Sequence, residues 1–255
     1  MTRARLARPH TPSGDPDAQR RLCRGMAPAG AGRLTPSIIA RTRFVDERVL
    51  AAISAGTSQV VVLGAGYDDR ALRFRTAGVR FFEVDHPATQ ADKAHRLQTM
   101  NAADPPVLAA ADFGRDDVGG VLAACGHDAG QPSLFICEGL LVYLDQPTCL
   151  RLLSALRARA ATGSTLAVSL VIHRDGLDSA RVLEVANSRR RVAASEPFLT
   201  IMSAAAHLDL LGQTGWQAAE SADAAALGTG AEPGRSLLVS AHPVGGAGAG
   251  PGAVG

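Results

Sequence analysis

Short runs of apolar residues alternate along the chain with segments in which apolar residues recur every three or four positions. Runs of the first kind are typical of strands buried on both faces of a parallel sheet, and segments of the second kind of helices that cover it. Strands are predicted at residues 59–63, 80–84, 107–111, 133–137 and 165–172. Helices are expected around them, at residues 36–53, 87–100, 118–125 and 147–161. This alternation predicts an α/β fold with a doubly wound sheet.

The last third of the chain follows a less regular pattern. It predicts helices at residues 177–191 and 204–212, a weak strand from residue 215 and a clear last strand at 236–240. We therefore expect a Rossmann-like, mostly parallel seven-stranded sheet with an antiparallel last strand and helices on both faces.

A glycine turn follows the first predicted strand at once, as Gly64, Ala65 and Gly66. Glycine allows positive φ and a close approach of the backbone to a ligand. The helix after the turn is expected to direct free N–H groups to the same place. Asp85 ends the next strand, about 20 residues on, where a carboxylate can accept hydrogen bonds from both hydroxyls of a ribose. This layout predicts a nucleoside-binding site.

The residues after the glycines argue against a dinucleotide. A dinucleotide fingerprint has a third small residue three positions after the second glycine. Asp69 stands at that position, next to Asp68, and two acids beside a pyrophosphate would repel it. They suit a nucleoside that carries positive charge. S-adenosylmethionine is such a ligand, because it joins adenosine to a sulfonium and an amino acid.

Further acids follow other predicted strands, as Asp112 with Phe113 and as Glu138. Ligands of open α/β sheets bind at the carboxyl ends of the strands, so these side chains should converge. A single acid there could be only a helix cap, but the set fits an adenosyl cation. Asp85 would hold the ribose, Asp112 and Phe113 the adenine, and Glu138 would lie near the amino group or the sulfonium.

The composition narrows the class of protein. The chain has 26 Lys and Arg against 24 Asp and Glu, and this balance argues against nucleic acid as the main partner. No apolar run is long enough to span a membrane. The four cysteines lack C-x-x-C spacing and no H-E-x-x-H motif occurs, so we expect reduced thiols, a cytoplasmic protein and no metal site.

Several motifs taken together point to a known family. They lie at residues 41–46, 61–70, 82–87, 111–112 and 137–144. With these segments the sequence resembles the leucine carboxyl methyltransferase family over roughly residues 36–240. The resemblance implies the class I fold and an S-adenosylmethionine-dependent O-methyltransferase, of which the family has many bacterial members.

The resemblance also implies roles for individual residues. Arg41 would pair with the methionine carboxylate, a bidentate task that suits arginine, and Gly64 would lie against the ligand. The segment Asn187–Arg191 corresponds to an arginine-rich helix near the substrate mouth, whereas the N-terminus is expected to lack the longer helical lid of many members. The full set predicted to bind the cofactor is Arg41, Gly64, Ala65, Gly66, Asp85, His86, Asp112, Phe113, Glu138 and Gly139.

The expected organisation is a mobile N-terminal segment and short lid at residues 1–35, a methyltransferase domain at 36–243 and a disordered Gly/Ala tail at 244–255. The acceptor is expected to be a carboxylate or hydroxyl of a small molecule, such as a polyketide-type metabolite. A carboxylate needs no general base, whereas a phenol would, and His173 is the candidate base. The candidate residues on the substrate side are Tyr143, His173, Arg190 and Arg191.

Other functions remain as alternatives or are excluded by missing motifs. A domain that binds the cofactor only to regulate, and a protein C-terminal carboxyl methyltransferase, both stay open. A short-chain reductase needs Tyr-x-x-x-Lys, but Tyr67 and Tyr143 are followed four residues on by Ala71 and Pro147. A phosphate-binding G-x-x-x-x-G-K and a hydrolase G-x-S-x-G are both absent from the sequence.

Overall fold

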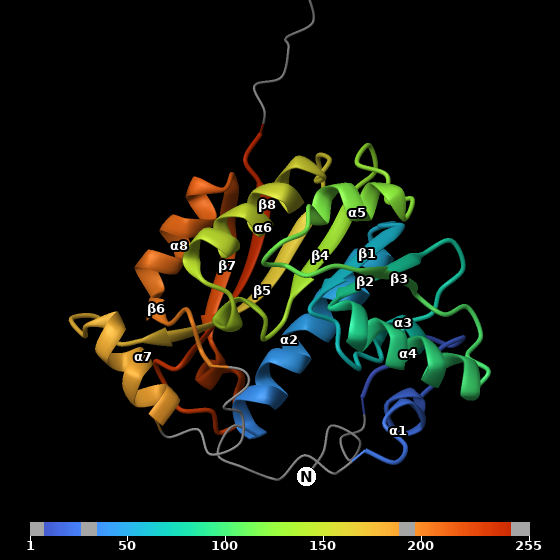
Figure 1. Ribbon diagram of the computed structural model, residues 1–255, viewed down its shortest axis with the longest axis horizontal. Helices are drawn as coiled ribbons and strands as arrows, with labels where there is room; N and C mark the ends of the chain where they lie inside the picture. The colour runs from blue at the N-terminus through green and yellow to red at the C-terminus, as the bar shows by residue number, and fades with distance from the viewer. Residues whose placement is uncertain (1–7, 27–34, 189–196, 246–255) are drawn as a thin grey trace, which may run out of the picture.

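The computed structural model describes residues 8–26, 35–188 and 197–245, and the fold is that of these residues (Figure 1). The strands are β1 (Gln59–Leu63), β2 (Arg80–Asp85), β3 (Val107–Ala110), β4 (Ser133–Cys137), β5 (Thr165–His173), β6 (Met202–Ser203), β7 (Trp216–Asp223) and β8 (Ser236–Pro243). The helices are α1 (Ala18–Leu22), α2 (Thr35–Ser54), α3 (Arg70–Arg73), α4 (Pro87–Thr99), α5 (Val118–Ala124), α6 (Gln146–Ala158), α7 (Ser179–Ser188) and α8 (Ala204–Gln213), with the 3-10 turns η2 (Leu141–Tyr143) and η3 (Ala224–Leu227).

The sheet confirms the predicted fold class. Its strand order is β3-β2-β1-β4-β5-β8-β7. Strand β1 pairs in parallel with β2 and β4, while β8 is antiparallel to both β5 and β7. The two-residue strand β6 pairs with β5 outside this path and is an addition to the seven strands expected. The chain order reverses between β1 and β4, which is where open α/β sheets bind ligands.

Helices cover both faces of the sheet (Figure 1). On the face that we call the apolar face, α5, α6 and α8 pack on apolar side chains of the central strands. On the opposite face, which we call the charged face, α2 and α3 pack on the sheet beside η3, and α4 packs there beside α1. Both layers bury strand residues from alternate positions, which is why the central strands read as unbroken apolar runs.

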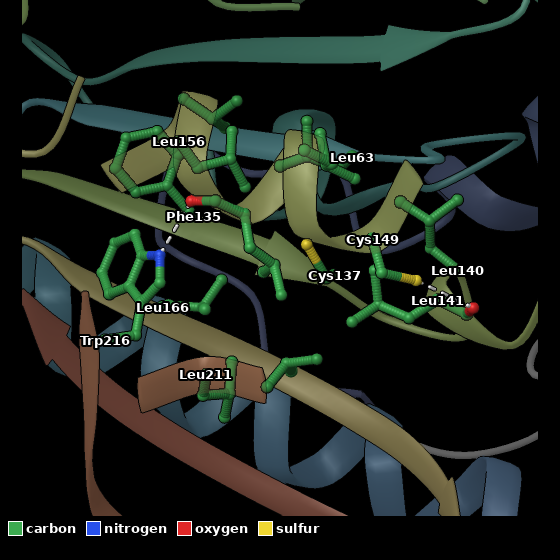
Figure 2. Packing of buried hydrophobic residues seen from close by; sticks show 14 of the residues in the cluster. Leu63, Phe135, Cys137, Leu140, Leu141, Cys149, Leu156, Leu166, Leu211 and Trp216 are labelled. Carbon is green, nitrogen blue, oxygen red and sulfur yellow. Dashed lines mark hydrogen bonds between the residues drawn. The ribbon is translucent and has the colours of Figure 1, made fainter. Parts of the chain in front are cut away.

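The apolar face contains the only tryptophan of the chain, Trp216. Its side chain is 1% exposed, and its ring meets that of Phe135 edge to face at 6.0 Å between centroids. The indole Nε1 donates a hydrogen bond to the carbonyl oxygen of Leu153 at 3.0 Å (Figure 2). The antiparallel strand β7, which begins at Trp216, is thereby joined to α6 and to the central strand β4.

The described part of the N-terminal segment packs on the domain, and the mobility expected for residues 1–35 stays a prediction. The N–H of Thr11 donates to the carbonyl of Arg73 at 3.1 Å, and that of Asp15 donates to Leu72 at 3.0 Å. The side chain of Arg8 is 8% exposed and lies 2.7 Å from Asp69 Oδ2. The polar groups of this segment find partners on α3 and on Asp69, which directly precedes it.

Two helices differ in length from their prediction. The segment after the glycine turn forms only the four-residue α3. The helix expected at 177–191 begins at Ser179 and is described to Ser188, so the candidates Arg190 and Arg191 lie outside the described residues. Among the helices that the structure describes, none has both the length and the apolar character needed to cross a bilayer.

Candidate functional site

The glycine turn after β1 has the backbone that only glycine adopts easily. Gly64 has φ +63° and Gly66 φ +47°, both in the left-handed region. A Cβ on Gly64 would lie 2.9 Å from Leu140 Cδ1, so the turn packs closely on the segment after β4. A Cβ on Gly66 would meet no heavy atom within 4 Å. Gly66 therefore leaves open space at the carboxyl end of the sheet.

The N–H groups of the turn are used within the protein, which corrects the expectation of free donors. Gly64 and Ala65 both donate to the carbonyl oxygen of Val84, at 2.8 and 3.2 Å. The N–H of Arg70 donates to Asp68 Oδ1 at 2.7 Å at the start of the short helix α3. Side chains rather than a helix N-terminus must therefore supply most of the contacts to a ligand at this edge.

Asp85 lies at the end of β2, next to this turn, as predicted. Its Oδ2 accepts a hydrogen bond from the N–H of Gly66 at 2.6 Å, and its Oδ1 accepts one from the N–H of His86 at 2.7 Å. His86 caps α4, because its Nδ1 accepts the N–H of Ala88 at 3.3 Å. The carboxylate of Asp85 is half-buried and held beside the open turn. Its role toward a ribose stays a prediction.

Asp112 and Phe113 follow β3 at the same edge. Asp112 Oδ1 accepts the N–H of Gly114 at 2.9 Å, and the Asp112 side chain is 39% exposed. Phe113 is half-buried and packs on the core of the apolar face. The ring thus stands at the border between the core and the open edge. The adenine role of this pair stays a prediction.

Glu138 and Arg41 form one unit at the end of β4. Arg41 Nε donates to Glu138 Oε1 at 3.0 Å, and the Glu138 side chain is 5% exposed against 29% for Arg41. A Cβ on Gly139, which has φ +68°, would lie 2.8 Å from Arg41 Nη1. The guanidinium therefore rests on Gly139 and reaches the surface beyond Glu138. The structure brings all three predicted residues together.

Asp68 and Asp69 are buried and paired with arginines, so they are not the unpaired acids that the argument from repulsion assumed. They are 7% and 1% exposed. Asp68 Oδ2 lies 2.5 Å from Nη1 of Arg70, and Asp69 Oδ2 lies 3.3 Å from Nε of Arg73. These arginines supply the opposite charge inside the domain. The two acids are paired behind the turn, so their presence in the sequence does not by itself exclude a phosphate.

A layer of paired charges on the charged face was missed by the sequence reasoning. Asp46, on α2, bonds Arg70 Nε at 2.7 Å and Arg73 Nη2 at 3.0 Å. Although burial opposes the charged form, Asp68, Glu138 and Asp46 raise the pKa of Arg70 well above its usual value. The signal in the sequence was Asp69 four residues before Arg73, a spacing that allows an ion pair on a helix.

The layer continues to α4, where Lys93 forms an ion pair with Glu83 of β2. Lys93 Nζ also donates to the carbonyl oxygen of Asp68 at 2.9 Å. Both side chains are buried, at 2% and 1% exposure. Burial raises the pKa of Glu83 to about 7, against the attraction of Lys93.

The predicted substrate-side residues that the structure describes lie around η2 and β5. Tyr143 is half-buried, and its ring packs on that of Phe198 at 5.5 Å between centroids. His173 is 8% exposed. Its Nδ1 lies 2.8 Å from the carbonyl oxygen of Arg174, and its Nε2 lies 2.8 Å from Ser179 Oγ. Both ring nitrogens of this candidate base are thus engaged within the protein.

The residues at this edge fit S-adenosylmethionine by their chemistry. Gly66 has open space in front of it, and the carboxylate of Asp85 beside it suits hydroxyl groups. The Arg41 guanidinium, fixed on Gly139, suits a carboxylate at the other end of the ligand. No group of three or more His, Cys, Asp or Glu in the described ranges is arranged to hold a metal ion.

The fold is shared with solved methyltransferases. A provisionally named methyltransferase of Thermobifida fusca YX matches with a TM-score of 0.63, 15% identity and coverage of 95% of this chain and 97% of that one. Magnesium protoporphyrin IX methyltransferase of Synechocystis PCC 6803, with bound S-adenosylhomocysteine, matches with a TM-score of 0.56 and 14% identity over 89% and 93% of the chains. The architecture is therefore that of class I S-adenosylmethionine-dependent methyltransferases.

The sequence identifies the family more narrowly. The profile of the family described as leucine carboxyl methyltransferase matches residues 4–157. This match covers more than half of the chain and includes the glycine turn, Asp85 and Glu138. The chain belongs to the leucine carboxyl methyltransferase family, as its motifs predicted.

Relatives from actinobacteria carry a related name. A Streptomyces avermitilis protein, provisionally named as an S-adenosyl-L-methionine-dependent methyltransferase, is 41% identical over 151 residues, which are 56% of this chain and 53% of that protein. A protein of Mycolicibacterium gilvum with the same provisional name is 32% identical over 203 residues, or 78% and 66% of the two chains. The chain spans about half the length of the first relatives that it matches.

Proposed function

We propose that this chain is an S-adenosylmethionine-dependent O-methyltransferase that acts on a carboxylate of a small molecule. The observation that carries the proposal is the convergence of the open Gly66, the half-buried Asp85 and the Arg41–Glu138 pair at one edge of the sheet. Membership of the family and the cofactor in the relatives' names support it. When bound, the cofactor supplies an electrophilic methyl group on a sulfonium.

The chain's own residues bind and orient in this proposal. Asp85 would accept hydrogen bonds from the ribose, and Asp112 with Phe113 would hold the adenine. Arg41 would pair with the methionine carboxylate, with Glu138 and Gly139 beside it. The closely packed turn at Gly64 would fix the distance between the two halves of the site. Orientation of this kind contributes roughly 7 kcal/mol or more to such transfers.

The environment of His173 favours a carboxylate acceptor over a hydroxyl. A carboxylate is already ionised at neutral pH, so it attacks without losing a proton. A phenol must lose its proton to a base. His173 would have to give up its contact with Arg174 or with Ser179 to serve as that base. The proposal therefore assigns no general base and places catalysis in alignment and exclusion of water.

The acceptor side supports a substrate with an apolar body. The rings of Tyr143 and Phe198 pack together there, and Leu199 beside them is 46% exposed. The N–H of Leu199 donates to the carbonyl oxygen of Val142 at 2.7 Å, which joins this segment to η2. An aromatic or polyketide-type carboxylic acid fits such a wall. We place this chemistry in a domain of residues 36–243.

The test is transfer of labelled methyl groups from S-adenosylmethionine to matched acceptors. Aromatic and aliphatic carboxylic acids would be offered in parallel with the corresponding phenols and alcohols. Labelled product that releases volatile methanol in mild base is a methyl ester, whereas a methyl ether keeps its label. Esters from the acids support the proposal, and label only in base-stable ethers would contradict the carboxylate.

Binding of the cofactor is tested separately by calorimetry. Asp85→Ala is expected to weaken the binding of S-adenosylhomocysteine by about 1–3 kcal/mol, the cost of leaving a polar group unpaired. Unchanged affinity would remove Asp85 from the site. Binding without turnover on any acid would favour a regulatory role, and turnover confined to the C-terminal carboxylate of a peptide would favour a protein substrate.

A further inference from the structure

Arg70 is a guanidinium without exposed surface that contacts acids from separate parts of the chain. Its Nε bonds Asp46 of α2 at 2.7 Å, and its Nη1 bonds Asp68 of the glycine turn at 2.5 Å. Its Nη2 lies 2.7 Å from Glu138 Oε2, after β4. One buried side chain therefore joins the turn after β1 to the end of β4 and to α2.

Arg41 holds the other oxygen of the same carboxylate. Its Nε donates to Glu138 Oε1 at 3.0 Å, while Arg70 pairs with Oε2. The two arginines differ in exposure, since the side chain of Arg41 is 29% exposed and that of Arg70 is 0% exposed. Arg41 can therefore reach a ligand, and Arg70 cannot. Whatever Arg70 does for binding, it does through Glu138 and Arg41.

The second link runs through α2. Arg41 and Asp46 both belong to this helix, and Asp46 is the α2 partner of Arg70. Arg70 thus fixes the helix that carries Arg41 as well as the carboxylate that orients its guanidinium. A planar guanidinium spreads its donors over a wider area than the compact ammonium of lysine, which suits it to three carboxylates.

We propose that Arg70 is a positioning residue for the amino-acid end of the cofactor. This inference rests on the proposed function, because it takes the Arg41–Glu138 pair as the site of that end. Loss of Arg70 would release Oε2 of Glu138, although Oε1 would keep its hydrogen bonds from Arg41 at 3.0 Å and Thr42 at 3.4 Å. The carboxylate would then orient the Arg41 guanidinium on Gly139 less firmly.

The nucleoside end is expected at Gly66 and Asp85, whose hydrogen bonds involve neither Glu138 nor Arg70. The turn that carries Gly66 is also held by Lys93, which donates to the carbonyl oxygen of Asp68 at 2.9 Å. Binding of the two ends should therefore respond differently.

The experiment measures two ligands by isothermal titration calorimetry on the full chain. S-adenosylhomocysteine carries the amino-acid end, and 5′-methylthioadenosine lacks it. Arg70→Lys is expected to raise the Kd for S-adenosylhomocysteine at least tenfold and to change the Kd for 5′-methylthioadenosine by less than twofold. Equal weakening of both ligands, or unchanged S-adenosylhomocysteine, would overturn the proposal. The first result would indicate a general structural role.

Arg73→Lys is the matched control. Arg73 is also buried, at 1% exposure, and shares Asp46 with Arg70. Among the described contacts it has none with Glu138. In this variant the Kd for neither ligand should change by more than twofold. A selective loss of affinity for S-adenosylhomocysteine, like that expected for Arg70→Lys, would overturn the assignment to Arg70. Wild-type protein that binds neither ligand would refute the proposed function, and this inference with it.

A second variant keeps the test decisive if Arg70→Lys does not fold. Asp46→Asn loosens Arg70 on α2 and leaves Glu138 unchanged. Selective weakening of S-adenosylhomocysteine would support the positioning role. Equal weakening of both ligands would overturn it.

Discussion

The two faces of the sheet are stabilised in different ways. The apolar face buries a continuous cluster of aliphatic and aromatic side chains between the strands and α5, α6 and α8 (Figure 2). The charged face buries apolar side chains too, but it also contains a layer of paired charges behind the glycine turn. Its members among the described residues are Arg8, Arg41, Asp46, Asp68, Asp69, Arg70, Arg73, Glu83, Lys93 and Glu138.

The difference shows what each face contributes. Apolar burial is roughly proportional to area and tolerates many arrangements. A buried charge is stable only with its partners in place, so it fixes their relative positions at a cost in desolvation. The charged layer lies behind Gly64 and Gly66 and includes Glu138, which places it directly behind the proposed site. We infer that the apolar face supplies stability and that the charged face fixes the site.

The largest effect is expected from the apolar face. Trp216→Ala should lower the free energy of unfolding by about 3–5 kcal/mol, because it leaves a cavity beside Phe135 and an unpaired carbonyl at Leu153. Denaturation by urea measures it. Trp216→Phe, which keeps most of the ring, should cost much less. If both variants lost the same free energy of unfolding, packing of the ring would not be the source of the stability.

Lys93→Met should cost about 3 kcal/mol at pH 8, because it leaves the carboxylate of Glu83 buried without its cation. The cost should fall as the pH approaches 6, where Glu83 can take up a proton. The double variant Lys93→Met with Glu83→Leu should recover most of the loss. A single variant whose cost is the same at both pH values would contradict the buried pair.

The pH dependence of the wild type sharpens the same point. Burial raises the pKa of Glu83 to about 7 from 4.5, so between these values the folded state keeps a proton that the unfolded state has lost. This group's stabilising contribution is therefore present below pH 4.5 and is lost as the pH rises toward 7, by up to about 1.4 kcal/mol per pH unit. Unfolding curves of wild type and the double variant, compared from pH 5 to 7, measure it. Parallel curves would contradict it.

The smallest effect is expected at the edge of the charged layer. Arg8→Ala should cost about 1–2 kcal/mol, because it removes the nearer of the two arginines that pair with the buried Asp69. Arg20→Ala is the control, since Arg20 pairs with Asp17 at exposures of 72% and 56% and such pairs contribute little. Thermal unfolding of the two variants compares them. Equal shifts would show that the N-terminal segment does not complete the layer.

The apolar pattern predicted much of the fold. Strands such as 59–63 and 133–137 are confirmed residue for residue. A strand buried on both faces is an unbroken apolar run, so its ends are marked where polar residues or glycine begin. The two-residue strand β6 was missed, since it is too short to show a period. The helical run predicted after the glycines forms only the four-residue α3.

The candidate site was predicted only in its outline. The ends of β1, β2 and β4 meet at one edge, as the position of acids after apolar runs indicated. The direction in which each acid points could not be read from the chain. Asp68 and Asp69 lie close to Gly66 in the sequence, as residues that contact a ligand would. Both side chains nevertheless point inward toward arginines. Partners distant in sequence, such as Asp46 and Arg70, decide that direction.

The most direct test of the central claim is a crystal structure of the protein soaked with S-adenosylhomocysteine. The account predicts the nucleoside in front of Gly66 with its ribose hydroxyls on Asp85, and the amino-acid carboxylate on Arg41. A nucleoside bound elsewhere, with Asp85 turned to solvent and the Arg41–Glu138 pair unoccupied by ligand, would contradict it.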